Sequence, residues 1–545
     1  MVSRWWILLI GLLSFSIRFH NLTQVLVDGH FYFVDGDCYS RMARAQMVSK
    51  APGTVVHFQQ FENWPEGVVS HATAPLDYLI VGLDRVVRMV WPKEGRLAVL
   101  GEHSLDIAGA LVSPLLGVAL CVCVGFWARG LRRSNGDRLL GWWCAPLLLA
   151  ISPAMVHATV LGRPDHQSLI VFCVGLALIA EQRLLCAPTK IWSVLGGAMW
   201  GLSIWVSLFE PLILWGCVCI AGLVLARREW LNPTRLLWGV TLAVCLTIAY
   251  MIEGLPFALP NLAFQDTLMR WGASIGELHS LDQLEALGGW LSALCWVAPV
   301  ALWFCVRSEK DASRRWLLLS AGLLFLTLLL TIWQIRWSPY LALCFVLLTP
   351  WILSSIPRQS LVMLVAGLSL WPIAREWDEL WFPDAETSEA RYLDRSERIN
   401  ARLAALRMRS DEVLPFVAPW WLSPSISYWS GQPAVAGTGH EGIAGILDTA
   451  RFFLTEDPKE ARAILERRKV KLVVAGDPSR AVKNSMDILG KALPRNPLAE
   501  QLWGSSVDPA WGLVGEKNIT TFRVLDVVPT GVKTESQTPV ENAGK

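Results

Sequence analysis

The stretch DIAGALVSPLLGVALCVCVGFW, at residues 106–127, is followed at once by ARGLRRSNGDR, at residues 128–138. The first stretch is apolar and long enough to cross a bilayer as a helix, which takes about 20 residues. The second is a short loop with four arginines, and loops of this kind lie on the cytoplasmic side of a membrane. The pair therefore predicts a membrane-spanning helix whose C-terminal end is cytoplasmic.

Similar apolar stretches recur through the first 374 residues. Hydrophobic residues make up 53% of the chain and charged residues 17%, whereas a soluble protein carries about 25% charged residues. We therefore predict a polytopic α-helical membrane protein with about 11 transmembrane helices, which together form a transmembrane domain at residues 1–374. The helices are expected near residues 5–22, 106–127, 139–158, 167–185, 191–208, 210–226, 235–252, 289–306, 316–333, 337–353 and 360–374.

The basic residues also predict the orientation of the chain. Every second loop carries arginine or lysine, as residues 128–138 do, so the alternate loops are expected outside. These external loops comprise residues 23–105, 159–166, 253–288 and 334–336. An odd number of spans places the C-terminal part outside as well. In a bacterium this describes a protein of the cell inner membrane with a periplasmic C-terminal domain.

The chain changes character after residue 374. Residues 375–530 are expected to form a small α/β extracytoplasmic domain, and the polar residues 531–545 a disordered tail. The helices of the α/β domain are predicted near 386–409 and 458–468, and its strands near 413–417, 471–475 and 520–528. All 12 cysteines lie at or before Cys344, which excludes a disulfide framework or a cysteine zinc site in this domain.

Four polar clusters fall in the predicted external loops, where helices begin or end. They are Asp35 with Asp37, Asp165 with His166, Glu277 beside His279, and Arg336 between two spans. Paired carboxylates can bind a divalent cation, and an arginine can bind a phosphate. Each cluster alone is also typical of a helix cap, an exposed acid or an arginine that reaches lipid headgroups. Their common side of the membrane favours one shared site.

The order of these clusters resembles the catalytic subunit of oligosaccharyltransferase, a family of the type C glycosyltransferases. Asp37-Cys-Tyr-Ser-Arg-Met-Ala-Arg44 is similar to the first acidic motif of that family, and Gly162-Arg-Pro-Asp165 is similar to its second. Ser274-Ile-Gly-Glu277 resembles the Ser/Thr-x-x-Glu element of its mobile external loop, and Arg336 resembles the arginine that contacts the lipid phosphate. Pro419–Gly431 resembles the region of its Trp-Trp-Asp motif. The resemblance covers residues 1 to about 450.

This resemblance implies a glycosyltransferase that moves a glycan from a polyprenyl-(pyro)phosphate carrier to a protein or glycan acceptor outside the cytoplasm. Asp37, Asp165 and Glu277 would hold Mg²⁺ or Mn²⁺, with His166 as a further ligand. Asp37, Glu277 and Arg336 would be the catalytic residues, and Arg336 would bind the donor phosphate. The acceptor would contact an aromatic group formed by Trp420, Trp421, Tyr428 and Trp429.

Two positions depart from the pattern of that family. Leu422 stands where the family has the Asp of Trp-Trp-Asp, which leaves recognition of a protein sequon open. Gln167 stands where the second motif has a further metal ligand, and the adjacent His166 can take that place. The predicted spans are also about two fewer than the family has.

Other classes of function remain as alternatives. The first is a lipid-linked monosaccharide transferase that acts on a lipid or a surface glycan, which the loss of the Asp at Leu422 favours. The second is a membrane transporter, which needs ionisable residues within the spans, and Glu210 is the main one. A structural membrane protein would not bring the four polar clusters together. The net charge of +2 and the absence of a basic tract outside short loops argue against a nucleic-acid partner.

Overall fold

The computed structural model describes residues 2–90, 103–230, 232–254, 264–356, 358–503, 508–515 and 523–527. The chain forms two compact units. The first, here called the membrane unit, comprises Met1–His57, Ser70–Leu259 and Ile275–Tyr392. The second, here called the C-terminal unit, comprises Phe58–Val69, Pro260–Ser274 and Leu393–Lys545. The predicted boundary between residues 374 and 375 stays a prediction, and the predicted tail 531–545 lies outside the described residues.

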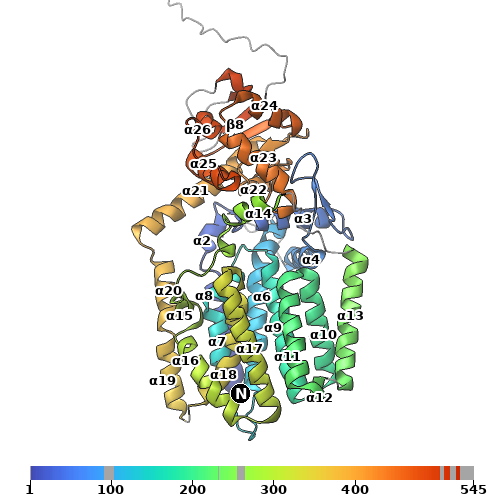
Figure 1. Ribbon diagram of the computed structural model, residues 1–545, viewed down its shortest axis with the longest axis vertical. Coiled ribbons are helices and arrows are strands. Elements are labelled where there is room, and N and C mark those ends of the chain that lie inside the picture. Colours follow the sequence, from blue (N-terminus) through green and yellow to red (C-terminus); the bar gives the residue numbers. More distant parts are fainter. Residues whose placement is uncertain are drawn as a thin grey trace, which may run out of the picture. The chain divides into compact units, whose positions relative to one another are not determined.

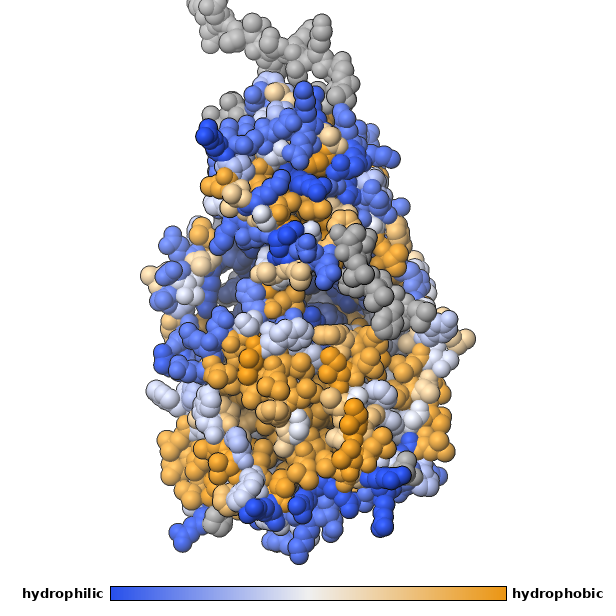
Figure 2. Space-filling model, in the orientation of Figure 1, coloured by the Kyte–Doolittle hydropathy of each residue, from blue (hydrophilic) through white to orange (hydrophobic). Residues whose placement is uncertain are grey.

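The membrane unit is a bundle of apolar helices that run alongside one another (Figure 1). Figure 2 shows apolar side chains over the surface of this bundle and hydrophilic side chains at the end where α12 (Arg227–Trp230) lies. The helices of the bundle are α1 (Val2–Arg18), α6 (Ser104–Arg129), α7 (Cys144–Ile151), α8 (Pro153–Ala158), α9 (His166–Cys186), α10 (Lys190–Val206), α11 (Phe209–Leu225), α13 (Pro233–Glu253), α15 (Ala286–Leu291), α16 (Leu294–Ser308), α17 (Asp311–Trp333), α18 (Ser338–Ser354), α19 (Gln359–Ser369) and α20 (Trp371–Trp381).

Each apolar stretch predicted as a span is largely helical in the structure, and three of them are interrupted. The stretch at 289–306 divides into α15 and α16 at Ser292, where φ is +111°. The stretch at 139–158 divides into α7 and α8 at Ser152, because Pro153 has no backbone N–H for a continuing helix. The stretch at 360–374 divides into α19 and α20, again before a proline, Pro372. Within the described residues, five helices are long and apolar enough to cross a membrane, and three shorter apolar helices accompany them. The membrane class is therefore confirmed, while the count of about 11 spans stays a prediction.

Small residues allow α10 and α13 to pack closely. A Cβ atom on Gly197 of α10 would lie 2.3 Å from the carbonyl oxygen of Trp238 in α13, and one on Gly201 would lie 2.5 Å from Cβ of Cys245. Helices in membranes associate through such small residues because lipid supplies no hydrophobic force between them. The glycines of α10 therefore set the distance between these two helices.

Replacing Gly197 by alanine should force α10 and α13 apart. The added methyl meets backbone, which cannot rotate away, so we expect a loss of about 1–3 kcal/mol of stability. Gly239→Ala is the matched control, because nothing lies within 4 Å of a Cβ at that helical glycine. Thermal unfolding of the purified protein in detergent measures both. A Gly197→Ala protein as stable as the Gly239→Ala protein would contradict this packing.

Two helices and two hairpins belong to the region predicted as the first external loop. The helices are α3 (Gly36–Lys50) and α4 (Ala74–Val90), and they share a buried ion-pair network. Asp77 of α4 accepts hydrogen bonds from Arg41 at 2.8 Å and from Arg44 at 3.0 Å. The hairpins are β1 (Leu26–Val27) with β2 (His30–Phe31), and β3 (Phe58–Gln59) with β4 (Val68–Val69). Among its described residues, this predicted loop therefore contains helices and hairpins, and the ion pairs of Asp77 hold α3 against α4.

The C-terminal unit contains a four-stranded sheet in the order β5-β6-β8-β7. β5 (Phe416–Val417) is parallel to β6 (Leu472–Ala475), which is antiparallel to β8 (Arg523–Val527), and β7 (Leu513–Gly515) pairs with β8. The helices are α21 (Ala385–Arg407), which begins in the membrane unit, α22 (Ser423–Ser430), α23 (Ile443–Leu454), α24 (Pro458–Arg467), α25 (Pro478–Leu489) and α26 (Leu498–Trp503). The predicted α/β character of this part is confirmed.

Two segments that precede residue 374 pack into the C-terminal unit. Arg468 binds the first of them: its Nε lies 2.7 Å from Asp448, and its Nη1 donates to Asn63 Oδ1 and to the Trp64 carbonyl at 3.2 Å. In the second, α14 (Gln265–Gly272), Arg270 donates to the carbonyl of Ile488 at 3.0 Å. Both segments come from loops predicted to be external.

Candidate active site

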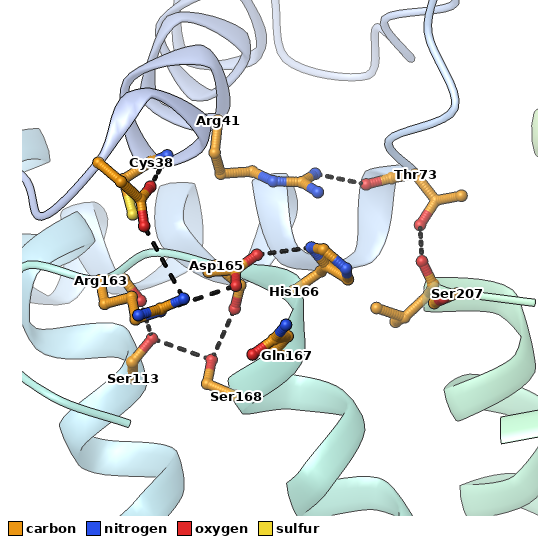
Figure 3. Close-up of polar contacts among 12 residues, drawn as sticks. Cys38, Arg41, Thr73, Ser113, Arg163, Asp165, His166, Gln167, Ser168 and Ser207 are labelled. Carbon is orange, nitrogen blue, oxygen red and sulfur yellow. Dashed lines mark hydrogen bonds and ion pairs between the residues drawn. The ribbon is translucent and has the colours of Figure 1, made fainter. Parts of the chain in front are cut away.

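The second motif forms a tight turn that ends at the first residue of α9. Gly162 has φ +75°, and a Cβ there would lie 2.8 Å from Val25, so only glycine fits without strain. The turn is held by its backbone: Gly162 N–H donates to Ala110 O, and Gly162 O accepts from Val34 N–H, both at 3.0 Å. The hydroxyl of Ser168 donates to the carbonyl of Asp165 at 2.8 Å (Figure 3). These contacts fix the direction of the Asp165 side chain.

Asp165 is a buried carboxylate between two basic side chains. Its Oδ1 lies 2.5 Å from Nδ1 of His166, and its Oδ2 lies 3.8 Å from Nε of Arg163. Burial alone would raise the pKa of Asp165, but the charge and hydrogen bond of His166, together with Arg163, outweigh it and hold the pKa well below its usual range. Asp165 is therefore an anion at neutral pH.

The first acidic motif lies beside this turn. Asp35 caps α3, where its side chain accepts from Cys38 N–H at 3.0 Å, and its Oδ2 lies 3.8 Å from Nη2 of Arg163. Asp37 lies in the first turn of the same helix and is exposed. Arg163 thus joins the starts of α3 and α9. Asp35, predicted only as one of a carboxylate pair with Asp37 that can bind a cation, makes the contact with Arg163 that links the two motifs.

Glu277 reaches the same site from the predicted loop 253–288. It lies in the 3-10 turn η2 (Gly276–Leu278), and its Oε2 accepts a hydrogen bond from Nε2 of Gln167 at 3.1 Å. Gln167 is in the first turn of α9, two residues after Asp165. Gln167 departs from the second motif of the resembled family, which has a metal ligand at this position. The structure gives a reason for the change, because an amide can donate to the Glu277 carboxylate, whereas a second carboxylate would repel it.

Arg336 lies next to the Glu277 turn, in the 3-10 turn η3 (Ile335–Trp337) before α18. Backbone hydrogen bonds hold the two turns together, from Ile335 N–H to His279 O at 2.9 Å and from Leu281 N–H to Ile332 O at 3.0 Å. The guanidinium pairs through Nη2 with Glu210, a fully buried acid in the first turn of α11. Sequence reasoning noted Glu210 as an intramembrane acid but did not connect it with Arg336.

The electrostatics of Arg163 show how closely the acids gather. Burial would lower the pKa of this guanidinium. The carboxylates of Asp35, Asp165 and Glu277 outweigh that effect and raise it. All three predicted acidic clusters therefore act on one buried cation, although the motifs that carry them lie far apart in the sequence.

The four aromatic residues predicted to bind an acceptor lie in the C-terminal unit, around α22. Trp420 and Trp421 are half-buried and pack edge to face, with ring centroids 6.0 Å apart. Trp420 donates to Asn484 at 2.6 Å, and the Arg480 guanidinium lies 4.6 Å from the Trp421 ring. Tyr428 and Trp429 are both buried at 8% exposure. The first pair thus has accessible ring surface, and the second pair packs largely inside the unit.

Leu422, which replaces the acidic residue of the Trp-Trp-Asp motif, is buried at 5% exposure. It precedes α22 and contributes to the interior of the C-terminal unit. A different carboxylate, that of Glu397, contacts Trp421. Its Oε1 lies 3.5 Å from Nε1 of Trp421, and its Oε2 lies 2.6 Å from Nη1 of Arg480.

Replacing Asp165 by asparagine should destabilise the site, since Arg163 and His166 would lose their buried anion. We expect a loss of about 3 kcal/mol. The stability that ionised Asp165 gives the wild-type protein is present at pH values above its pKa in the unfolded chain, about 3.9. It is lost as the pH falls toward the lower pKa of Asp165 in the folded protein. Unfolding measured at pH 7 and at about pH 2 tests this, with the exposed Asp282→Asn as control. Asp165→Asn should differ most from wild type at pH 7, and an equal difference at both values would contradict the assignment.

No protein-family model matches the chain. One curated protein does: 186 residues are 25% identical to dolichyl-phosphooligosaccharide-protein glycotransferase 1 of Archaeoglobus fulgidus. The match covers 34% of this chain and 27% of that protein, so this chain corresponds to about a quarter of the curated relative's length.

Solved structures match nearly the whole chain at low identity. The oligosaccharyltransferase of Archaeoglobus fulgidus, solved with zinc and sulfate, has a TM-score of 0.65 at 16% identity, covering 96% of this chain and 74% of that one. ArnT from Cupriavidus metallidurans, bound to undecaprenyl phosphate, has a TM-score of 0.53 at 12% identity, covering 96% of this chain and 98% of that one. This chain is therefore an integral membrane protein with the type C glycosyltransferase fold, and the predicted resemblance to oligosaccharyltransferase is confirmed.

Proposed function

We propose that this protein is a membrane glycosyltransferase that moves a glycan from a polyprenyl-(pyro)phosphate carrier to an acceptor on the extracytoplasmic face. The observation that carries the proposal is the hydrogen bond between Gln167 and Glu277, beside the Arg336 turn. It joins the second motif to the Ser-x-x-Glu element within a type C fold. Similar proteins were solved with an inhibitory peptide and dolichol-phosphate and with undecaprenyl phosphate, which supports a lipid-phosphate donor.

The donor phosphate would bind at Arg336. Nε of Arg336 and the hydroxyl of Tyr340, one helical turn later, are buried and have no hydrogen-bond partner among the described residues. Buried donors of this kind are costly unless a ligand satisfies them, and a phosphate oxygen accepts from both. When the bond between the sugar and the phosphate breaks, its electron pair stays on the phosphate oxygen, and the guanidinium stabilises the charge that forms there.

The acceptor would be activated by the acidic residues. Its nucleophilic atom attacks the anomeric carbon as the bond to the phosphate breaks, and its proton passes to a carboxylate, Glu277 or Asp37. Gln167 holds Glu277 at the start of α9, so the base is fixed on a rigid helix although it comes from a loop. The half-buried Trp420 and Trp421 would contact the acceptor, and the more buried Tyr428 and Trp429 would complete the aromatic group.

A divalent cation, Mg²⁺ or Mn²⁺, is the proposed cofactor. Asp37, Asp165, Glu277 and His166 would supply oxygen and nitrogen ligands that both ions accept, and the excess of carboxylates over arginines at the site favours a cation. The ion would orient the acceptor and neutralise negative charge when bound. As a group, Asp37, Asp165 and Glu277 do not come within 4.8 Å of one another in the described structure, so the ion would have to draw them together.

Cation binding should raise the unfolding temperature of the purified protein. Mn²⁺ in excess over EDTA adds stability because binding selects the folded state. A double variant, Asp37→Asn with Glu277→Gln, should lose most of that increase, whereas Asp282→Asn, an exposed acid of the same loop, should keep it. An equal increase in wild type and the double variant would place the cation elsewhere.

The acceptor is the least defined part of this proposal. The buried Leu422 favours the second candidate, a lipid-linked monosaccharide transferase that acts on a lipid or a surface glycan, because the carboxylate of the Trp-Trp-Asp motif is absent. The likeness to ArnT, which spans 98% of that chain, is consistent with either acceptor. A location in the inner membrane, with the C-terminal unit in the periplasm, is proposed from the basic loops.

Transfer from a labelled polyprenyl-linked glycan by the purified full-length protein tests the activity. Glu277→Gln should reduce the rate by at least about 100-fold, because the variant keeps a side chain of the same size but cannot accept a proton. Asp282→Asn is the control and should transfer at the wild-type rate. Offering peptide, lipid and glycan acceptors separately identifies the acceptor class from the labelled product. Full transfer by Glu277→Gln would contradict the role of this residue.

A further inference from the structure

Glu210 is an unusual residue to find next to a site for an anionic ligand. It lies in the first turn of α11 at 1% exposure, and its Oε1 pairs with Nη2 of Arg336. Its other oxygen, Oε2, accepts a hydrogen bond from the hydroxyl of Ser207 at 3.0 Å. A buried carboxylate is stable only while it is paired and hydrogen-bonded, and both conditions are met here.

Glu210 also interacts electrostatically with two other ionisable groups. Its charge acts on His166, at the start of α9, and on Tyr340, in the first turn of α18. Glu210 therefore belongs to the same electrostatic site as Asp165 and Glu277, although it comes from a different helix.

The pairing creates competition for the guanidinium. Arg336 directs Nη2 at Glu210, while its Nε has no hydrogen-bond partner among the described residues. A phosphate that binds Nε would lie near the Glu210 carboxylate, and like charges that face one another in a buried site repel strongly. Arg336 can bind the phosphate fully only if it weakens its contact with Glu210.

We propose that Glu210 is an exchangeable counter-ion for Arg336, a positioning residue that competes with the carrier phosphate for the same guanidinium. This inference rests on the proposed function, because it takes the phosphate of the lipid carrier as the competing ligand. Without the carrier, Glu210 keeps Arg336 paired within the apolar unit. With the carrier bound, the guanidinium turns to the phosphate and Ser207 retains the released carboxylate. Glu210 therefore weakens ground-state binding and speeds release of the used carrier.

Phosphate binding by Glu210→Gln distinguishes this role from a structural one. Glutamine has the same size and can still hydrogen-bond to Ser207, but it carries no charge. An exchangeable counter-ion predicts that the variant binds undecaprenyl phosphate in detergent at least about 10-fold more tightly than wild type. It also predicts slower dissociation and a lower turnover rate at saturating donor. A merely structural partner predicts the reverse, since Arg336 would lose its position and bind phosphate more weakly.

Glu181→Gln is the matched control for Glu210→Gln, because it also removes one partner of a buried ion pair. Glu181 lies in α9, fully buried, with its Oε2 2.5 Å from Nη1 of Arg235, and 15 residues of helix, about 22 Å, separate it from His166. Its loss should lower the unfolding temperature without changing phosphate affinity. Inorganic phosphate, titrated in parallel, shows whether the site needs the lipid: equal gains for both ligands indicate recognition of the phosphate alone.

The outcomes separate this inference from the proposed function. If Arg336→Gln binds undecaprenyl phosphate as wild type does, the phosphate site itself is wrong. If Arg336→Gln loses binding and Glu210→Gln gains none, only the counter-ion role is wrong. Should Glu210→Gln fail to fold, Glu210→Asp keeps the charge but is one methylene shorter, so it should hold Arg336 less closely and bind the carrier more tightly than wild type. Equal or weaker binding by Glu210→Asp would overturn the inference.

Discussion

An acidic side chain buried among the apolar helices lies beside a basic side chain, and the arrangement of the membrane unit depends on this constraint. Burying an ion without a partner costs more than the fold can supply. Asp77 is paired with Arg41 and Arg44, Glu181 with Arg235, and Glu210 with Arg336. Each of these pairs joins two helices, so charge pairing also fixes which helices are neighbours.

The candidate site uses the same constraint where helices begin. Asp165 at the start of α9 is held by His166 and Arg163, and Arg163 reaches Asp35 at the start of α3. These side chains can be buried because they form ion pairs, and a ligand can take the place of one partner in such a pair. The tight turn at Gly162 positions the group, and the hydrogen bond from Gln167 adds Glu277 from a loop. Rigid helix starts and one loop contact together form the candidate site.

Hydropathy predicted most of the architecture, because it is a local signal. The apolar stretches became helices, and the strand expected at 471–475 is Leu472–Ala475. The four polar clusters of the predicted external loops were also visible in the sequence. A local pattern could not show which residues of the site touch one another. Gln167 and Glu277 are 110 residues apart in the sequence, and Glu210 and Arg336 are 126 residues apart. Such contacts depend on how helices pack. For the same reason, the sequence did not show that residues 58–69 and 260–274 join the C-terminal unit.

The most direct test of this account is a structure of the full-length protein with a polyprenyl phosphate bound, determined by electron cryo-microscopy. The phosphate should lie within hydrogen-bond distance of Arg336 and Tyr340, beside the turn that carries Glu277. A phosphate bound instead at the basic loop of residues 128–138, with Arg336 still paired with Glu210, would contradict it.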